Sequence, residues 1–413
     1  MSARNSQLPI EAVHSLTTNV VGSEQRLVSI KSDITSTTSL NPRAARFKFP
    51  QTGSLAPLQG YLALDVEVSV AGGTTSLSLK NGVASAIKQI NFYIGGTLVD
   101  SVDEYAVYDR KEFDLRHGDD DESNGMWVQG YDTAANRKVQ QNAAGAGPHR
   151  YYIVPRIGLL KQPKLVELWG LPICELEVIF HNGYESIFIT GTQAAGDFAS
   201  FTNIEYFAEI HTMSQAYNDL AAKQIREGGL EIKFNTIESY SYNLSTGTNQ
   251  TINVNSQAKS AKKLFFMQRT ALNVANANKT LENVFLDDSL QDFQITMGTA
   301  VYPQQPIKVG AESWAELMKA MGKPLSHIRG TNVSQQEYQN TTTANTSKAY
   351  YGIDLERFQS SQHLSGIDLQ RNKLSLNLRY STAPAATANR LYVYVVRDNV
   401  LVIHPNNVFT VRF

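Results

Sequence analysis

The most ligand-like cluster in the sequence is the acidic run Asp119-Asp-Asp-Glu122, which lies in a polar stretch between two structured regions. Oxygen-rich loops bind Ca²⁺, but an EF-hand loop places its ligands at alternating positions. Here the four carboxylates are consecutive. A solvated loop tip explains the run better, and we expect no metal site there.

Histidine and cysteine are distributed in a way that argues against a catalytic or metal centre. The histidines are His14, His117, His149, His181, His211, His327, His363 and His404. They form no His-Glu-x-x-His motif and no pair at metal-ligand spacing. Cys174 is the single cysteine, which rules out an intrachain disulfide and a cysteine metal cluster. Its apolar neighbours indicate a small buried hydrophobe.

Other catalytic patterns are absent or unspecific. The sequence contains neither Gly-x-Ser-x-Gly nor the phosphate-binding Gly-x-x-x-x-Gly-Lys motif. Carboxylates are plentiful, but nothing singles out a glycosidase pair. We therefore predict that the protein is not an enzyme and has no catalytic, cofactor-binding or metal-binding residues.

Aromatic side chains are the remaining candidates for ligand binding. Trp127, the pair Tyr151-Tyr152 and the pair Tyr350-Tyr351 could stack on sugars or bases. Dense tyrosine on strands more often packs in cores and interfaces. The segment Tyr350-Tyr351-Gly352 follows a polar loop and is a candidate for contact between subunits.

Composition limits the possible partners. The chain has 413 residues, is 42% hydrophobic and 18% charged, and carries a net charge of −1. These values are typical of a globular protein of two or three domains. No basic run marks the first fifty residues, so we expect no direct sequence-specific binding of nucleic acid. We also find no signal peptide and no apolar stretch of about 18 residues. This indicates synthesis in a reducing, cytoplasmic compartment.

The elements that position these residues are mostly strands. Tyr61 to Val70 alternates apolar and polar residues, and so does Leu374 to Arg379. Two segments resemble capping boxes, Ser101 to Glu104 and Ser313 to Glu316, and each predicts the start of a helix. Residues 215–228 form the strongly helical passage near the middle, and Gly228-Gly229 ends it.

The last strands predict a hairpin. Two runs rich in β-branched and aromatic residues flank Arg397-Asp398-Asn399, which we interpret as a tight turn. Both faces of the first run are apolar, so the strand is expected to be covered on both sides. Tyr392 and Tyr394 are candidates for the side that meets another domain or another subunit.

The two halves of the chain contain predicted elements in the same order. In each half a strand, ending in Ile94 or containing Ile295, is followed by a glycine turn and a serine-capped helix. A hairpin at 175–189 corresponds to the closing hairpin. A large all-β chain can be aligned with itself by chance, but the shared order favours a duplication.

We predict an all-β protein of two tandem eight-stranded jelly-roll sandwiches, with short inserted helices and long loops. The expected parts are an N-terminal arm (1–40), a first jelly roll (41–214) with a long loop (114–150), a helical linker (215–229), and a second jelly roll (230–413) with a polar loop (331–349).

This arrangement resembles the double jelly-roll major capsid proteins of the PRD1/adenovirus-like lineage of icosahedral DNA viruses. The stretches that carry the resemblance are Ile87 to Thr97 and Asn389 to Ile403, which are similar to core strands of the two rolls. The resemblance covers residues 41–413.

The resemblance implies a homotrimer that forms a pseudo-hexameric capsomer of the virion shell, with upright strands and outward loops. It also implies contacts with neighbouring capsomers, with minor capsid or cement proteins, and with an internal membrane through the N-terminal arm. Two alternatives stay open. One is a two-domain carbohydrate-binding or carbohydrate-active protein, and the other is a virion spike or vertex protein.

Overall fold

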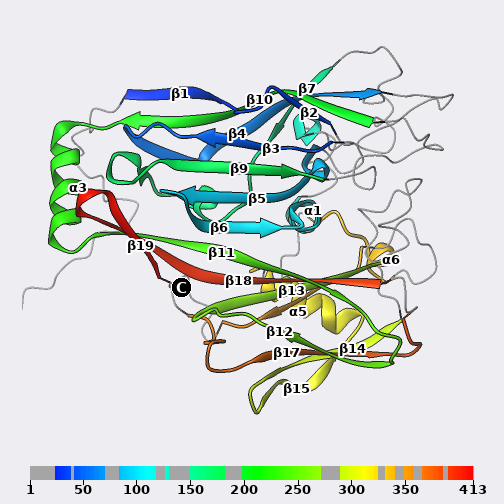
Figure 1. Ribbon diagram of the computed structural model, residues 1–413. Helices are drawn as coiled ribbons and strands as arrows, with labels where there is room; N and C mark the ends of the chain where they lie inside the picture. Colours follow the sequence, from blue (N-terminus) through cyan, green and yellow to red (C-terminus); the bar gives the residue numbers. More distant parts are fainter. Residues whose placement is uncertain are drawn as a thin grey trace, which may run out of the picture.

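The computed structural model shows four antiparallel sheets that follow one another across the molecule (Figure 1). The described residues are 24–38, 41–69, 83–117, 126–129, 148–181, 198–270, 289–323, 331–339, 348–356, 365–384 and 389–412.

The first half of the chain forms two facing sheets. One sheet has the order β1 (Glu24–Lys31), β10 (Phe198–Thr212), β4 (Ser54–Ser69) and β7 (His149–Ile153), with β2 (Ser36–Thr38) beside β10 and β8 (Val166–Glu167) beside β4. The other has the order β3 (Ala44–Lys48), β9 (Cys174–Phe180), β5 (Ile87–Ile94) and β6 (Thr97–Asp103).

The second half repeats this pattern. Its first sheet has the order β11 (Leu230–Asn243), β18 (Asn389–His404), β13 (Ala261–Thr270) and β16 (Tyr350–Asp354), with β19 (Val408–Arg412) beside β18. Its second sheet has the order β12 (Asn249–Val254), β17 (Leu374–Tyr380), β14 (Leu290–Met297) and β15 (Ala300–Lys308).

Both halves have the same strand order. When the eight main strands of each half are counted along the chain, one sheet contains the first, eighth, third and sixth, and the other contains the second, seventh, fourth and fifth. This is the jelly-roll arrangement. The prediction of two tandem eight-stranded jelly rolls is therefore confirmed.

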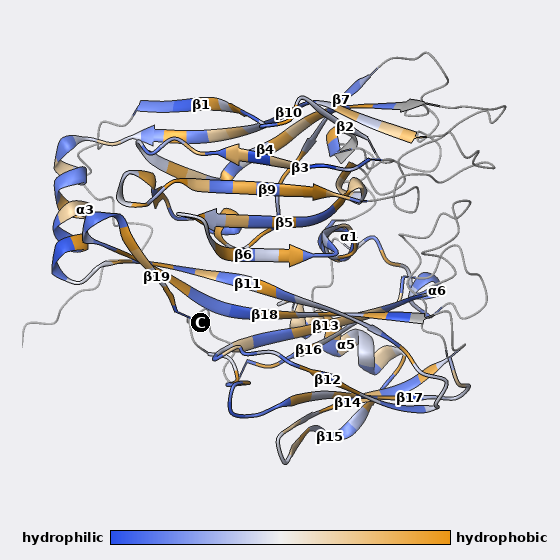
Figure 2. Cartoon of the chain, viewed as in Figure 1, coloured by the Kyte–Doolittle hydropathy of each residue, from blue (hydrophilic) through white to orange (hydrophobic). Residues whose placement is uncertain are grey.

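The sandwiches form because the strands alternate. In β4 the side chains of Leu62, Leu64 and Val66 are buried, whereas Asp65 between them is only partly buried. The same alternation appears along β17, and Figure 2 shows apolar residues interleaved with polar ones on many strands. The buried apolar residues of both rolls belong to one continuous core.

Four α-helices lie among the described residues, and five 3₁₀ turns accompany them. The helices are α1 (Tyr105–Arg116), α3 (Gln215–Glu227), α5 (Ala311–Ala320) and α6 (Gln335–Tyr338). The turns are η2 (Val83–Ala86), η3 (Met126–Gln129), η5 (Leu159–Lys161), η6 (Leu168–Gly170) and η8 (Pro405–Asn407). In each roll a helix follows the fifth main strand, α1 after β6 and α5 after β15. This part of the predicted repeat is confirmed.

Helix α3 matches the predicted helical segment, and its start is explained locally. The Ser214 side chain accepts a hydrogen bond from the Tyr217 amide, and Gly229 has a positive φ of 89° just after the helix ends.

Both predicted capping boxes are wrong. Ser101 lies in β6, where its hydroxyl donates to Asn91 Oδ1 at 2.7 Å, and α1 begins at Tyr105 after a left-handed Glu104 without a side-chain cap. Ser313 lies inside the first turn of α5, where its Oγ accepts from the Gly310 amide at 3.0 Å. The prediction for Ser101 fails because its hydroxyl bonds to Asn91 in the neighbouring strand β5 and is not available to cap a helix.

The predicted closing hairpin is also wrong. β18 runs unbroken from Asn389 to His404 and pairs with β11 along most of its length. Asp398 and Asn399 are buried in it, because Asp398 binds Lys262 Nζ at 3.0 Å and the Ser260 hydroxyl at 2.7 Å. By strand order the counterpart of β18 is β10, so the second part of the predicted repeat fails. Residues 182–189 of the other proposed hairpin lie outside the described residues.

Three predicted boundaries need correction. Residues 24–31 and 36–38, expected in the arm, are β1 and β2 and pair with β10. α1 continues to Arg116 and β7 starts at His149, so the predicted loop 114–150 is shorter at both ends. The predicted loop 331–349 contains α6.

Candidate functional site

The candidates for chemistry named from the sequence do not come together. The acidic run 119–122 and His14, His327 and His363 lie outside the described residues. Within the described ranges, no three His, Cys, Asp or Glu side chains are placed to hold a metal ion. Cys174 is buried, and burial raises the pKa of its thiol to about 12. The prediction of a small buried hydrophobe is confirmed, since such a thiol is a poor nucleophile.

The described histidines take separate local roles. The His117 ring lies 5.3 Å from that of Phe113 at the end of α1. His211 Nε2 lies 2.8 Å from Glu209 Oε1, and His404 Nε2 lies 3.0 Å from the Thr410 hydroxyl. In the described part of the chain, none of these pairs belongs to a group of three side chains that could hold a metal ion.

The most unusual chemistry in the described chain is at the junction of the two rolls, around α1 (Figure 1). Every residue of this helix except Arg116 is buried. The buried set includes five ionisable side chains, which are Asp109, Arg110, Lys111, Glu112 and Asp114. Fully buried charges are rare unless they are paired, so this helix must find partners around its whole circumference.

Asp114 connects the first roll to the second. Its carboxylate lies 2.6 Å from Arg110 Nη2 and accepts a 2.6 Å hydrogen bond from the Tyr350 hydroxyl of β16. Its backbone carbonyl accepts from the Asn332 amide at 2.7 Å, and Lys348 Nζ lies 3.8 Å from the carboxylate. One carboxylate thus satisfies a cation of the first roll and a hydroxyl of the second.

Lys111 and Glu112 form a second buried pair on the same helix. Lys111 Nζ lies 2.6 Å from Glu112 Oε1 and 3.7 Å from the centre of the Phe265 ring in β13. Burial lowers the pKa of Lys111 to about 8, although Glu112 opposes the shift. Burial alone would raise the pKa of Glu112, but Lys111, Lys161 and Arg116 outweigh it and hold this pKa well below its usual range.

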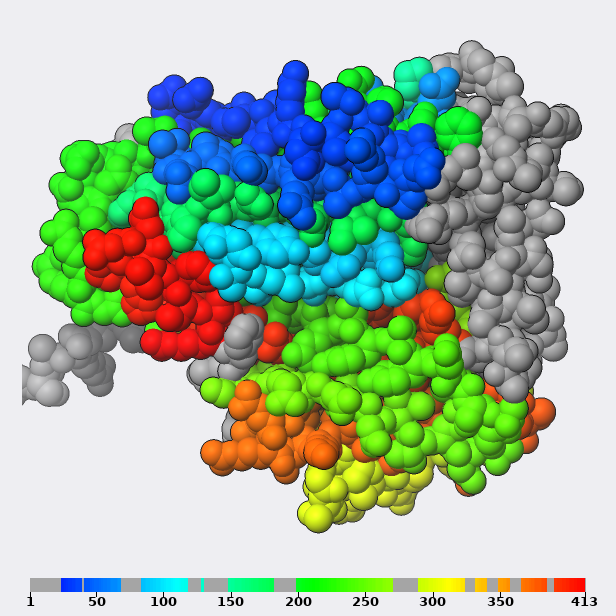
Figure 3. Space-filling model, viewed as in Figure 1, coloured from blue at the N-terminus to red at the C-terminus, as the bar shows by residue number. Residues whose placement is uncertain are grey.

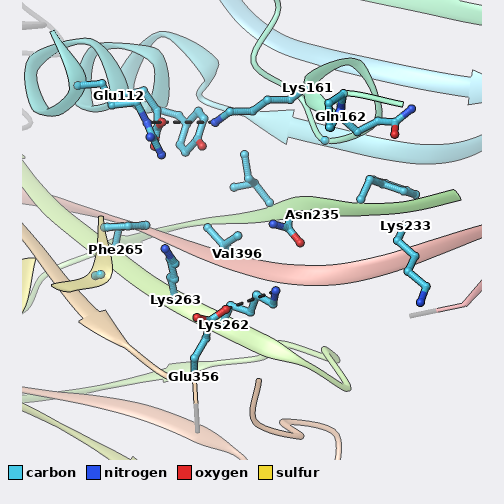
Figure 4. A pocket seen from close by; sticks show the side chains of 17 residues that line it. Glu112, Lys161, Gln162, Lys233, Asn235, Lys262, Lys263, Phe265, Glu356 and Val396 are labelled. Carbon is cyan, nitrogen blue, oxygen red and sulfur yellow. Dashed lines mark hydrogen bonds and ion pairs between the residues drawn. The ribbon is translucent and has the colours of Figure 1, made fainter. Parts of the chain in front are cut away.

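A cleft of about 820 Å³ opens beside this pair, between the rolls (Figure 4). Its charged lining residues are Glu112, Arg116, Lys161, Lys233, Lys262, Lys263 and Glu356. Five cations and two carboxylates give it an excess of positive charge. The described residues that line it include no serine, threonine, cysteine or histidine, and its one hydroxyl belongs to Tyr108. The lining is therefore suited mainly to ion pairing.

The tyrosines named from the sequence are part of the junction. The Tyr394 hydroxyl donates to the Glu104 carbonyl at 3.0 Å, and its ring lies 5.4 Å from that of Tyr108. Of the two options for Tyr394, contact with the first roll is confirmed. Tyr350 and Tyr351 are fully buried within the chain, so the idea that they contact another subunit is wrong.

Sequence reasoning missed the ionic junction of α1, although one signal was present. Apolar side chains occur at 105–108, 113 and 115, which surround the helix instead of forming one stripe. A helix that is apolar on all sides is expected to be buried on all sides.

Comparison with known proteins identifies the fold. No family model matches the sequence, and no curated protein shows significant sequence similarity to it. Solved structures do match, over nearly the whole chain. The chain has the double jelly-roll fold of viral major capsid proteins.

Three structures illustrate the match. PBCV-1 VP54, fitted into a reconstruction of the virophage Sputnik, aligns with a TM-score of 0.67 and 14% identity, covering 95% of this chain and 97% of VP54. The Faustovirus major capsid protein aligns with a TM-score of 0.65 and 9% identity, covering 96% of this chain and 93% of the Faustovirus chain. The mavirus major capsid protein aligns with a TM-score of 0.55 and 11% identity, covering 98% of this chain and 95% of the mavirus chain. The double jelly roll therefore persists here without recognisable sequence similarity.

Proposed function

We propose that this protein is the major capsid protein of an icosahedral virus, and that three copies form a pseudo-hexameric capsomer. The observation that carries the proposal is the repeated strand order, because two equal rolls in one chain give six equal rolls in a trimer. The double jelly-roll fold of proteins named as major capsid proteins supports it over nearly the whole chain.

The physical features agree with a shell component. A jelly roll leaves few free sheet edges, so it can be concentrated in a shell without uncontrolled strand pairing. The core that runs through both rolls and the buried charges of α1 make one rigid unit of them. The near-zero net charge suits a shell that does not bind the genome directly.

The remaining assignments belong to the same proposal. The protein acts in the virion shell after synthesis in the host cytoplasm, and it is not an enzyme. Residues 215–229 link the two rolls. Its partners are further copies of itself, minor capsid or cement proteins, and an internal membrane reached through the N-terminal segment. No helix in the described part of the chain is long and apolar enough to span a membrane.

The test is the mass of the purified full-length chain. Light scattering should give three times 45.7 kDa, about 137 kDa, and electron microscopy should show particles with a hexagonal outline. A monodisperse monomer at all concentrations would contradict the proposal.

A parallel measurement addresses the carbohydrate alternative. Binding to a glycan array, or hydrolysis of a glycan that is lost on substitution of one carboxylate, would argue against a purely structural protein. Location of the chain at special positions of the particle only would instead indicate a spike or vertex protein.

A further inference from the structure

The cleft between the rolls contains more positive charge than its own carboxylates balance. Five cations and two carboxylates line it, which is an excess of three positive charges in a protein whose net charge is −1. Arg116 and Lys161 come from the first roll, and the second roll contributes Lys233, Lys262 and Lys263. The fold thus brings like charges from both rolls to one place.

Much of this excess lies around Glu112. Lys111 Nζ lies 2.6 Å from its carboxylate, and Arg116 Nε lies 2.5 Å from it. Lys161 Nζ lies 3.4 Å from the same group. One negative charge therefore faces three positive charges at the first-roll side of the cleft.

Lys262 and Lys263 are neighbours in β13, but their surroundings differ. Lys262 Nζ lies 3.3 Å from Glu356 and 3.0 Å from Asp398, so its charge is balanced. Lys263 is half-buried and forms no ion pair with a carboxylate in the described part of the chain. Its side chain lies across the cleft from Lys161 (Figure 4). The charge of Lys263 is therefore unbalanced, like those of the first roll.

The lysine pKa values reflect the same crowding of positive charge. Burial lowers the pKa of Lys161 and that of Lys263, and repulsion from Arg116 contributes to both decreases. Nearby carboxylates oppose the decreases but do not cancel them. An anion held among these groups would supply the negative charge that the cleft lacks.

The size of the cleft and its donors define the class of ligand. Its volume of about 820 Å³ lies within the range of small-molecule pockets, about 300–1,000 Å³. Four of the five cations are lysines, which bind phosphate as point charges, whereas planar recognition of a carboxylate favours arginine. A phosphate monoester carries a charge of about −1.5 to −2 and three acceptor oxygens, so two such groups balance an excess of three positive charges.

We propose that this cleft binds a small anion with two or three phosphoryl groups, held by Arg116 and Lys161 of the first roll and by Lys263 of the second. The rolls already touch along β6 and β11, where their surfaces adjoin in Figure 3. The bound anion adds a second link between them. All of these residues belong to one chain, so the inference goes beyond the proposed capsomer and does not rest on it.

Binding of inorganic tripolyphosphate to the full-length protein tests the proposal. Titration calorimetry should show one tripolyphosphate per chain. The Tm should rise by about 5 °C when the free ligand is at about 100 times its Kd, because the ligand binds only the folded chain. Butanetetracarboxylate, an anion with four carboxylates, should bind about tenfold more weakly or less at the same ionic strength.

Lys263→Gln is the decisive variant, because it removes an unbalanced charge. The Tm of the ligand-free variant should equal or exceed that of the wild type, and its affinity for tripolyphosphate should fall about tenfold or more. Lys263→Arg keeps the charge and should retain most of the affinity. Lys223→Gln on α3 is the matched control, because the Lys223 side chain is 67% exposed and lies outside the cleft. This control should bind tripolyphosphate like the wild type.

Three results would overturn the proposal. The first is tripolyphosphate binding that Lys263→Gln does not weaken or that the tetracarboxylate matches, since the cleft would then be an unspecific positive surface. The second is no binding to the wild type, which would leave the proposed capsomer intact. The third is binding that appears only after Asp119 to Glu122 are replaced by their amides, which would assign the cleft to the acidic run of the chain itself.

Discussion

The substitution Asp114→Asn tests the role of α1 most sharply. It keeps the size of the side chain but removes the negative charge that faces Arg110 and Tyr350. Asp114 is fully buried and Arg110 is 2% exposed, so water cannot replace the lost partner. At the same time, the Tyr350 hydroxyl of the second roll loses its hydrogen bond to a charged carboxylate.

The expected cost follows from this burial. Removing one partner of a buried ion pair destabilises a protein by about 3–5 kcal/mol. The amide oxygen of Asn can still accept from Tyr350, so we expect the lower end, about 3 kcal/mol. For a domain of this size that corresponds to a fall of about 6–12 °C in Tm.

The assay uses tryptophans that report on the two rolls separately. Trp169 lies in the first roll, and Trp314 lies in α5 of the second. In a Trp127→Phe background, single-tryptophan variants that retain Trp169 or Trp314 follow denaturant unfolding of one roll each. The two transitions should coincide in the wild type and separate in Asp114→Asn, because the interaction between the two rolls is then weaker.

A control and a contradicting result complete the test. Asp368→Asn removes a surface partner of Arg371, 3.6 Å away, and should leave both transitions unchanged because exposed pairs contribute little. If Asp114→Asn shifts stability no more than Asp368→Asn, the ionic junction does not hold the rolls together.

Three further predictions concern the same junction. The pKa of Glu112 is depressed in the folded chain, so its contribution to stability is present above its ordinary pKa of 4.5 and is lost as pH falls. Glu112→Gln should therefore lower stability at neutral pH and flatten the loss of stability as pH falls below the ordinary pKa of 4.5. An unchanged acid profile in urea titrations would contradict this. Tyr394→Phe should lower the free energy of unfolding by about 1 kcal/mol, because it removes one hydrogen bond. Tyr394→Asp should prevent folding of the whole chain. Recovery of soluble, folded Tyr394→Asp protein would contradict this placement of Tyr394 in the junction. A Cβ added to Gly158 would clash with the Asn235 carbonyl of the second roll, whereas a Cβ added to Gly228 would meet no atom within 4 Å. Calorimetry should therefore show a Tm well below wild type for Gly158→Ala and a Tm close to wild type for Gly228→Ala. Equal Tm values for the two variants would refute the close packing at Gly158.

The parts of the fold that sequence alone predicted are those set by local patterns. Strands β4 and β17 alternate with period two, and α3 is bounded by Ser214 and by a glycine pair. These signals act over a few residues, so no knowledge of distant partners is needed.

The parts that failed depend on contacts between distant residues. Asp398 resembles a turn residue until it is placed beside Lys262 in a neighbouring strand. The charges of α1 resemble a solvated surface until Asp114 meets Tyr350, which is 236 residues away. Burial of a charge is determined by its partner, and the sequence pattern around it carries little information about that partner.

A cryo-microscopy map of the assembled particle tests the central claim most directly. The account predicts that trimers of this chain occupy the shell, each with six jelly rolls whose strands stand upright. Density for this chain at the vertices alone, or a shell built from monomers, would contradict it.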